Sequence, residues 1–198
     1  MLMALTTATA GGHSRARRLV CVLAALLAAT FLCAPMAADS GHQATVREVE
    51  GVYHVAASFD VPHPHSLAYG VLTDYEQVPR FMPDVRTSVV RERSPLRILL
   101  EQEAVAKFMF FSKRVHLLLE VRETPGAIRF RDTSYKSFER YEGGWTFTSH
   151  EDRTTIEYAL TAKPSFSVPG FVLSRLLKRD AGRMIAGLRA EMAKRAAK

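Results

Sequence analysis

Apolar and polar residues alternate through much of the second half of the chain, which is typical of β-strands. Residues 115–121, 128–131, 141–147 and 155–162 each carry apolar side chains at close to every second position. Successive side chains of a strand point to opposite faces, so each segment would present one apolar face and one polar face. Turn residues such as those of Glu123–Gly126 separate the segments. The pattern predicts a long antiparallel meander that covers a core on one side.

The period changes to that of a helix after Pro169-Gly170 and continues to about Arg195. Asp180 falls among the apolar positions, and a buried carboxylate without a partner is costly. We therefore expect it at the rim of the core, paired with Arg183 or a strand arginine; the alternative is a polar group inside a cavity. The apolar positions that would face the sheet are Leu173, Leu176, Leu177, Met184, Ile185, Leu188 and Met192.

Two short helices are predicted within Leu67–Pro83. The apolar positions at its start end just before Asp74, which could cap a second helix in a capping box with Gln77. Pro79 and Pro83 then end that helix, because proline disfavours helical geometry in the residue before it.

This order of elements, together with four local motifs, resembles the START-like (SRPBCC) superfamily, and within it the polyketide cyclase/dehydrase and coenzyme Q-binding protein branch. The resemblance extends over roughly residues 45 to 195. It implies an α+β helix-grip fold: a curved antiparallel sheet of about six to seven strands wrapped around a long C-terminal helix, with two short helices after the first strand and an apolar cavity inside. The motifs are Asp74-Tyr75-Glu76 with Pro79, Phe81 and Pro83; Glu142-Gly143-Gly144-Trp145; Thr154-Thr155-Ile156; and Pro164 to Leu177.

The N-terminal segment has the pattern of a secretory signal peptide. Three arginines (15, 17 and 18) precede an uncharged apolar run of fourteen residues, Leu19–Leu32, and small residues follow at Ala34–Ala38. The run is shorter than the roughly 20 residues of a spanning helix. We therefore expect residues 1–38 to be removed and residues 39–198 to form a periplasmic START-like domain; an uncleaved membrane anchor is the alternative.

Removal of this segment changes the chemistry available to the chain. Both cysteines, Cys21 and Cys33, fall within it, which excludes disulfides, thiolate metal sites and cysteine nucleophiles from the remainder. The net charge falls from +7 to +4, with 24 basic and 20 acidic residues remaining. A chain of this size is long enough for one domain with its own core.

The sequence offers little catalytic chemistry. It has no Gly-x-Ser-x-Gly elbow, no His-Glu-x-x-His motif and no phosphate-binding glycine loop. His63 and His65 lack a neighbouring carboxylate motif, so surface histidines are a better interpretation than metal ligands. We predict no catalytic residue, metal or cofactor. Acids interspersed among the basic residues, and the predicted export, argue against a nucleic-acid partner.

The resemblance predicts instead a hydrophobic small molecule, such as a lipid or isoprenoid quinone, held in the cavity by a carrier, chaperone or sensor that performs no catalysis. A few polar groups, including Arg140 and the tyrosines below, would orient its head group. An ordinary core uses the same residues, so an adaptor with a filled core is one alternative, and a cyclase/dehydrase-like enzyme acting on a polyketide-type substrate is another. The predicted ligand-binding residues are Tyr75, Phe81, Phe130, Tyr141, Trp145, Phe147, Tyr158, Leu160, Leu173, Leu177, Met184 and Leu188.

A second aromatic cluster, Phe108-Met109-Phe110-Phe111, is flanked by Lys107 and by Lys113-Arg114. Within a strand it would be ordinary core or edge. As an exposed turn it would be an apolar tip with basic residues around it, suited to transient contact with an anionic membrane surface.

Overall fold

The computed structural model describes residues 44–82, 84–108 and 111–198. The predicted signal peptide lies outside these residues, as do Met109 and Phe110 of the aromatic cluster. Residues 40–198 form a compact unit.

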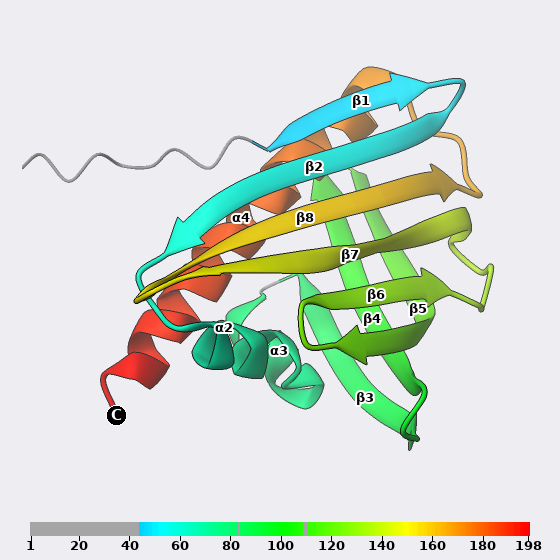
Figure 1. Ribbon diagram of the computed structural model, residues 1–198. Coiled ribbons are helices and arrows are strands. Elements are labelled where there is room, and N and C mark those ends of the chain that lie inside the picture. The colour runs from blue at the N-terminus through cyan, green and yellow to red at the C-terminus, as the bar shows by residue number, and fades with distance from the viewer. Residues whose placement is uncertain (1–43, 83, 109–110) are drawn as a thin grey trace, which may run out of the picture. The chain divides into compact units, whose positions relative to one another are not determined.

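The described residues form one antiparallel sheet of eight strands in the order β1-β2-β8-β7-β6-β5-β4-β3. Figure 1 shows this sheet with the long C-terminal helix α4 (Gly170–Ala196) running along one side of it. The α+β helix-grip fold and the extent of the last helix are therefore confirmed. The strands are β1 (Thr45–Val49), β2 (Val52–Val61), β3 (Val85–Arg93), β4 (Ile98–Phe108), β5 (Phe111–Thr124), β6 (Ala127–Asp132), β7 (Phe138–His150) and β8 (Arg153–Pro164).

The sheet has more strands than expected because an additional edge strand, β1, precedes the first strand expected from the sequence. β1 has five residues and is mostly exposed, so it shows no alternation that could be recognised from the sequence. It pairs with β2 around a turn at Glu50 and Gly51, both of which have positive φ angles of 52° and 76°. The short helices consequently follow the second strand rather than the first.

The connection after β2 contains α2 (His65–Leu72), a short 3-10 helix η1 (Tyr75–Gln77) and α3 (Val78–Phe81). The predicted capping box is wrong, because the side chain of Asp74 makes no hydrogen bond to the following turn. Its carboxylate lies 2.9 Å from the Arg195 guanidinium instead. A charged partner competes well with backbone amides for a carboxylate, and this ion pair joins the connection to the end of α4.

The core lies between the inner face of the sheet and α4. Strand β8 shows the alternation that the sequence predicts, with Ile156, Tyr158 and Leu160 buried. The buried face of α4 completes the core and comprises Leu173, Leu176, Ala181, Ile185, Leu188 and Met192.

Gly143 and Gly144 lie in the middle of β7, where the strand pairs in continuous register with β6 and β8. They therefore do not form a bulge. A Cβ atom on Gly143 would lie 2.2 Å from the Ala159 carbonyl oxygen, and one on Gly144 would lie 2.4 Å from that of Ile128. Only glycine allows the neighbouring backbones to approach this closely.

Candidate functional site

A cavity of about 280 Å³ lies inside the domain, bounded by the inner face of the sheet, the connection after β2 and the first half of α4. Ten of the twelve sequence-predicted ligand-binding residues line it. They come from segments far apart in the sequence, which the curved sheet and α4 bring together. These ten are Tyr75, Phe81, Phe130, Tyr141, Trp145, Tyr158, Leu160, Leu173, Leu177 and Met184.

The other two residues are buried but do not line the cavity. The ring of Phe147 packs edge-on against His65, with centroids 5.3 Å apart, between the sheet and α2. Leu188 is fully buried one turn of α4 beyond Met184. Both were assigned to the correct face of their element, but they lie beyond the end of the cavity.

One wall of the cavity was missed in the sequence. Strands β4 and β5 contribute Leu100, Gln102, Ala104, Val115 and Leu117 among others. The inward positions of β4 read Leu-Gln-Ala-Ala, which gives only a weak apolar alternation. The hairpin register, in which Leu100 pairs with Leu119 and Ala104 with Val115, places these residues on the same face.

A cluster of aromatic side chains on β7 and β8 contributes polar groups to the cavity wall. The rings of Trp145 and Tyr158 pack against each other at an interplanar angle of 37°, with centroids 4.4 Å apart. The hydroxyls of Tyr158 and Tyr141 lie beside each other. Burial, with a smaller contribution from Asp132, raises the pKa of Tyr141 to about 12, and burial also raises the pKa of Tyr158. Both hydroxyls are therefore protonated at neutral pH and can donate hydrogen bonds to a ligand.

A second polar group fixes the connection after β2 against the sheet. The Tyr75 hydroxyl donates a hydrogen bond of 2.6 Å to the Glu123 carboxylate, and Tyr69 donates a longer one of 3.3 Å. Arg93 lies 4.0 Å from the same carboxylate. Burial, followed by the hydrogen bond to Glu123, raises the pKa of Tyr75. The hydrogen bond to Glu123 therefore links Tyr75, which lines the cavity, to the end of β5.

The Tyr75→Phe variant tests the contribution of this hydrogen bond to stability. Because a hydrogen bond to a charged group contributes about 1.5–3 kcal/mol, we expect the free energy of unfolding to fall by about 2 kcal/mol. Tyr69→Phe is the matched control. Because its hydrogen bond is long and weak, its loss should lower the free energy of unfolding by less than about 1 kcal/mol. Urea unfolding of the two variants measures both values; equal losses would contradict the ranking.

Ion pairs between α4 and the segment before β3 lie at the wall of the partly open cavity. Asp180, which lines the cavity, contacts Arg179 at 2.9 Å and Arg183 at 3.3 Å. Arg183 also pairs with Asp84 at the start of β3. Asp180 is thus paired with Arg183 as the sequence predicts, and it is also a polar group of the cavity. Burial raises its pKa, and the hydrogen bond from Arg179 offsets part of this effect.

The Asp180→Asn variant tests the raised pKa. A carboxyl group whose pKa is higher in the folded state stabilises the fold at low pH and loses that contribution as the pH rises through its folded pKa. We therefore expect Asp180→Asn to gain stability relative to wild type between about pH 4 and pH 7.5. Urea unfolding of both chains at the two pH values measures the change in their difference. Asp84 also raises the pKa of Asp180. A change of the opposite sign would show that the attraction of Arg179 and Arg183 for the carboxylate outweighs both burial and Asp84.

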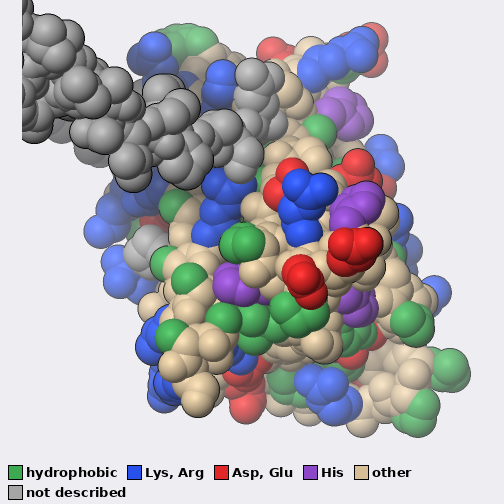
Figure 2. Space-filling model, turned by 60° about the vertical axis from the view of Figure 1, so that its left-hand side comes forward, with side chains coloured by type: hydrophobic (Ala, Val, Ile, Leu, Met, Phe, Trp, Pro, Cys, Tyr) green, Lys and Arg blue, Asp and Glu red, His purple; other side chains and the backbone are tan. Residues whose placement is uncertain are grey.

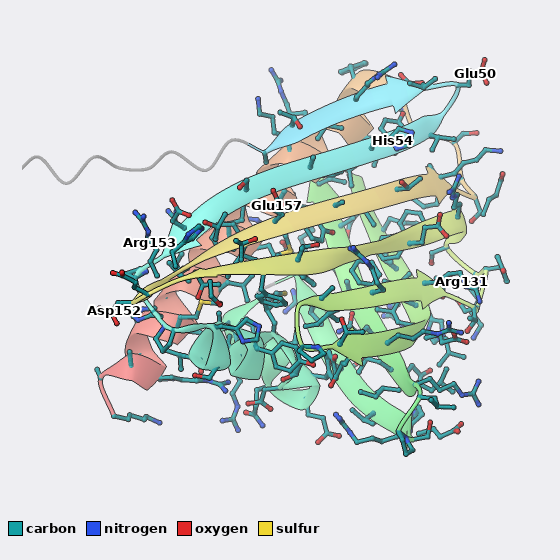
Figure 3. The ribbon with its side chains drawn as sticks, in the orientation of Figure 1. Glu50, His54, Arg131, Asp152, Arg153 and Glu157 are labelled. Atoms are coloured by element: carbon teal, nitrogen blue, oxygen red, sulfur yellow. The ribbon has the colours of Figure 1, made fainter. Side chains whose placement is uncertain are left out.

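A second depression, of about 610 Å³, lies on the outer face of the sheet. It has the larger volume, but it is shallow, and its walls include charged residues of neighbouring strands. His54 and Arg131, labelled in Figure 3, are among the residues that line it. On the face that Figure 2 draws, Lys and Arg side chains are interspersed with Asp, Glu and His. The internal apolar cavity is therefore the better candidate for a binding site.

One sequence hypothesis, the head-group role of Arg140, finds no support in the geometry. Arg140 is exposed and pairs with Glu142 rather than facing the cavity. Across the described part of the chain, no three His, Cys, Asp or Glu side chains are grouped as metal ligands would be. Within that same part, every helix is too short or too polar to cross a membrane.

Three solved structures illustrate the likeness of the fold. The aromatase/cyclase Zhui from Streptomyces sp. R1128 is 13% identical, with a TM-score of 0.64, and the match covers 73% of this chain and 96% of Zhui. A Thermus thermophilus protein is 23% identical, with a TM-score of 0.62 and coverages of 71% and 97%. The STAR-related lipid transfer protein from Xanthomonas axonopodis is 15% identical, with a TM-score of 0.60 and coverages of 77% and 99%. No curated protein matches the sequence.

The sequence itself matches a family over residues 61–189, from the end of β2 to the second half of α4. This range includes most of the sheet and most of the cavity. The chain therefore belongs to the polyketide cyclase/dehydrase and lipid transport family and has its START-like helix-grip fold.

Proposed function

We propose that this protein binds one apolar small molecule in its internal cavity and acts as a carrier, chaperone or sensor without changing its ligand chemically. The observation that carries the proposal is the cavity between the sheet and α4, whose lining is predominantly apolar. Apolar surface that leaves water contributes about 25 cal/mol per Å². The few polar groups can orient the ligand.

The size of the cavity limits what it can hold. At about 280 Å³, it is close to the lower end of the roughly 300–1,000 Å³ range of ligand pockets. An engineered cavity of about 150 Å³ accommodates benzene. A single acyl chain of moderate length or a compact ring system therefore fits, whereas a whole two-chain lipid or a long isoprenoid tail would have to extend out of the opening.

The polar groups favour binding over catalysis. The raised pKa values of Tyr141 and Tyr158 keep both hydroxyls protonated, so they can donate hydrogen bonds but are poor bases at neutral pH. The two aspartates that line the cavity, Asp84 and Asp180, are held by arginines. A ligand that carries a carbonyl or ether oxygen would find a donor in the tyrosine pair. The family description includes lipid transport, and the Xanthomonas neighbour is named as a lipid transfer protein.

We also propose that the protein acts in the periplasm. The arginines before Leu19–Leu32, the length of that apolar run and the small residues after it support export. The cysteine-free domain needs no oxidation to fold in any compartment.

The first experiment identifies the ligand. Residues 39–198 would be expressed and purified, the folded protein extracted with organic solvent, and the extract analysed by mass spectrometry beside that of Trp145→Ala. We expect a stoichiometric apolar compound that is reduced in the variant. An empty extract that stays empty after incubation with membrane lipids and quinones would contradict the proposal.

The second experiment measures binding directly. Trp145 is the single tryptophan of the chain and lines the cavity, so its fluorescence reports occupancy. Titration with lauric acid, dodecanol and decylubiquinone should give saturable changes. If the oxygen of a probe accepts a hydrogen bond from Tyr158, Tyr158→Phe should lower the affinity for that probe by about tenfold, which corresponds to a hydrogen bond of about 1.4 kcal/mol.

A cyclase-like enzyme is the second candidate. The observation in its favour is that Asp180, whose pKa is raised, lines the same cavity as the Tyr141–Tyr158 pair, so that a carboxyl group and a ketone-polarising donor share one site. Conversion of a polyketide-type substrate that is lost in both Tyr158→Phe and Asp180→Asn would favour the enzyme; a ligand recovered unchanged would favour the carrier.

A further inference from the structure

The outer side of the first turns of α4 carries an exposed aromatic residue among basic ones. Phe171 is 76% exposed. Arg175 and Lys178 are also exposed and follow it at helical spacings of four and seven residues, which places the three on one face. Neither cation forms an ion pair with a described residue. An exposed Phe in a basic surrounding is unusual for a face that contacts only water.

The β4–β5 hairpin adds basic residues beside this helix face. The guanidinium of Arg179 donates a hydrogen bond of 2.5 Å to the Lys107 carbonyl oxygen, which joins the hairpin to α4. The Lys113 ammonium lies 5.0 Å from the centre of the Phe166 ring, in the segment that leads into α4. We call Phe171, Arg175, Lys178, Lys107 and Lys113 together the basic surface.

Acidic residues are scarce around the basic surface. Residues 104–119 and 158–179, which contain all five of its members, include no Asp or Glu. The two aspartates nearby, Asp84 and Asp180, are already held by Arg183 and Arg179. Glu48 lies beside Gly170 at the edge of the surface. The surface therefore presents cations whose charge is little compensated.

The basic surface lies beside the cavity. Phe166, Val168, Leu173 and Leu177 line the cavity and belong to the same segment as Phe171 and Arg175. The two turns of α4 that form a cavity wall on their inner side thus carry Phe171 and the cations on their outer side.

We propose that the basic surface docks the protein on an anionic lipid bilayer and so places the cavity beside the lipid phase. The inference rests on the proposed function, because an apolar ligand partitions into membranes. If the cavity lies at the membrane surface, the ligand can pass directly between the bilayer and the cavity. Cations are attracted to anionic headgroups, and an aromatic ring beside them packs at the headgroup level. An acidic protein would match the charge but would leave the exposed Phe171 unexplained. The proposal does not depend on the membrane contact predicted at Phe108–Phe111, because the side chains of that cluster are not among those that the structure describes.

The test is sedimentation of residues 39–198 with phosphatidylcholine vesicles that contain 0 or about 30% phosphatidylserine, at low and physiological salt. The variant is Phe171→Ala/Arg175→Gln/Lys178→Gln. Each lysine or arginine near an anionic surface contributes about 1 kcal/mol, a factor of about five, so we expect the two lost cations alone to weaken binding about 25-fold. The matched control is Leu96→Ala/Arg131→Gln/Arg153→Gln, which removes one exposed apolar residue and two exposed cations elsewhere; Arg131 and Arg153 are labelled in Figure 3.

Binding that requires phosphatidylserine, weakens with salt and is lost in the variant but kept in the control would support the proposal. Equal binding of variant and control, or no binding of the wild type to anionic vesicles, would overturn it. Trp145 fluorescence with decylubiquinone separates this result from the proposed function. A variant that no longer binds vesicles but still binds the probe would show that the docking surface is independent of the cavity. A wild type that binds vesicles but not the probe would contradict ligand binding in the cavity and still support the docking surface.

Discussion

Replacing Gly143 with alanine is expected to destabilise the domain by about 3 kcal/mol or more, the upper range for overpacking a filled interior. The added Cβ would lie 2.2 Å from the Ala159 carbonyl oxygen and 3.1 Å from the Leu160 Cα atom. Both are backbone atoms of β8, so no side-chain rotation relieves the contact. The two strands must therefore separate at this position. The measurement is urea unfolding followed by circular dichroism.

Gly126→Ala is the matched control, because it adds the same methyl group to a glycine with no atom within 4 Å of the new Cβ. We expect a change of less than about 1 kcal/mol. If Gly143→Ala proved as stable as Gly126→Ala, the close approach of β7 and β8 would be wrong.

Ala104→Phe is expected to weaken ligand binding strongly without unfolding the domain. Ala104 lines the cavity from β4, and a phenyl ring is small enough to occupy part of the space, since about 150 Å³ accommodates benzene. Filling the cavity removes the volume that a ligand needs and adds apolar contacts. We expect the affinity for decylubiquinone, measured by Trp145 fluorescence, to fall at least tenfold, about 1.4 kcal/mol, with the free energy of unfolding unchanged or raised.

The control for the filling variant is Ala56→Phe, which adds the same ring to the exposed face of β2. It should bind the probe as the wild type does. Undiminished binding by Ala104→Phe would place the ligand outside the cavity, and unfolding of that variant would show that the cavity is too tightly packed to admit a ring.

The fold could be predicted where the pattern of side chains is strong. The alternation in residues 155–162 and the apolar face of α4 are both regular over many residues, and the structure has both. Strand β1 could not be found, since an exposed edge strand of five residues buries too little to leave a pattern. The side chain of Asp74 could not be assigned either, because its partner Arg195 is more than a hundred positions away.

The candidate site was only partly predictable for a related reason. Periodicity indicates which face a residue occupies, but not how far along the element the cavity extends. Phe147 and Leu188 occupy the inner faces of β7 and α4 yet lie beyond the cavity. Conversely, Gln102 and Ala104 line the cavity although their side chains give no apolar signal. How far the cavity extends along a strand depends on the hairpin register and on the curvature of the sheet. Both depend on several strands at once.

The pairing of β2 with β8 has a consequence for how the protein acquires its structure. Phe59 pairs with Ile156 and Val61 with Thr154, so the second strand remains without this neighbour until the chain has been made almost to its end. Contacts between such distant positions slow folding, typically to milliseconds or seconds. A nascent chain that lacks β8 leaves β2 and β7 without the strand that lies between them, so the sheet is completed only after residues 153–164 have been made.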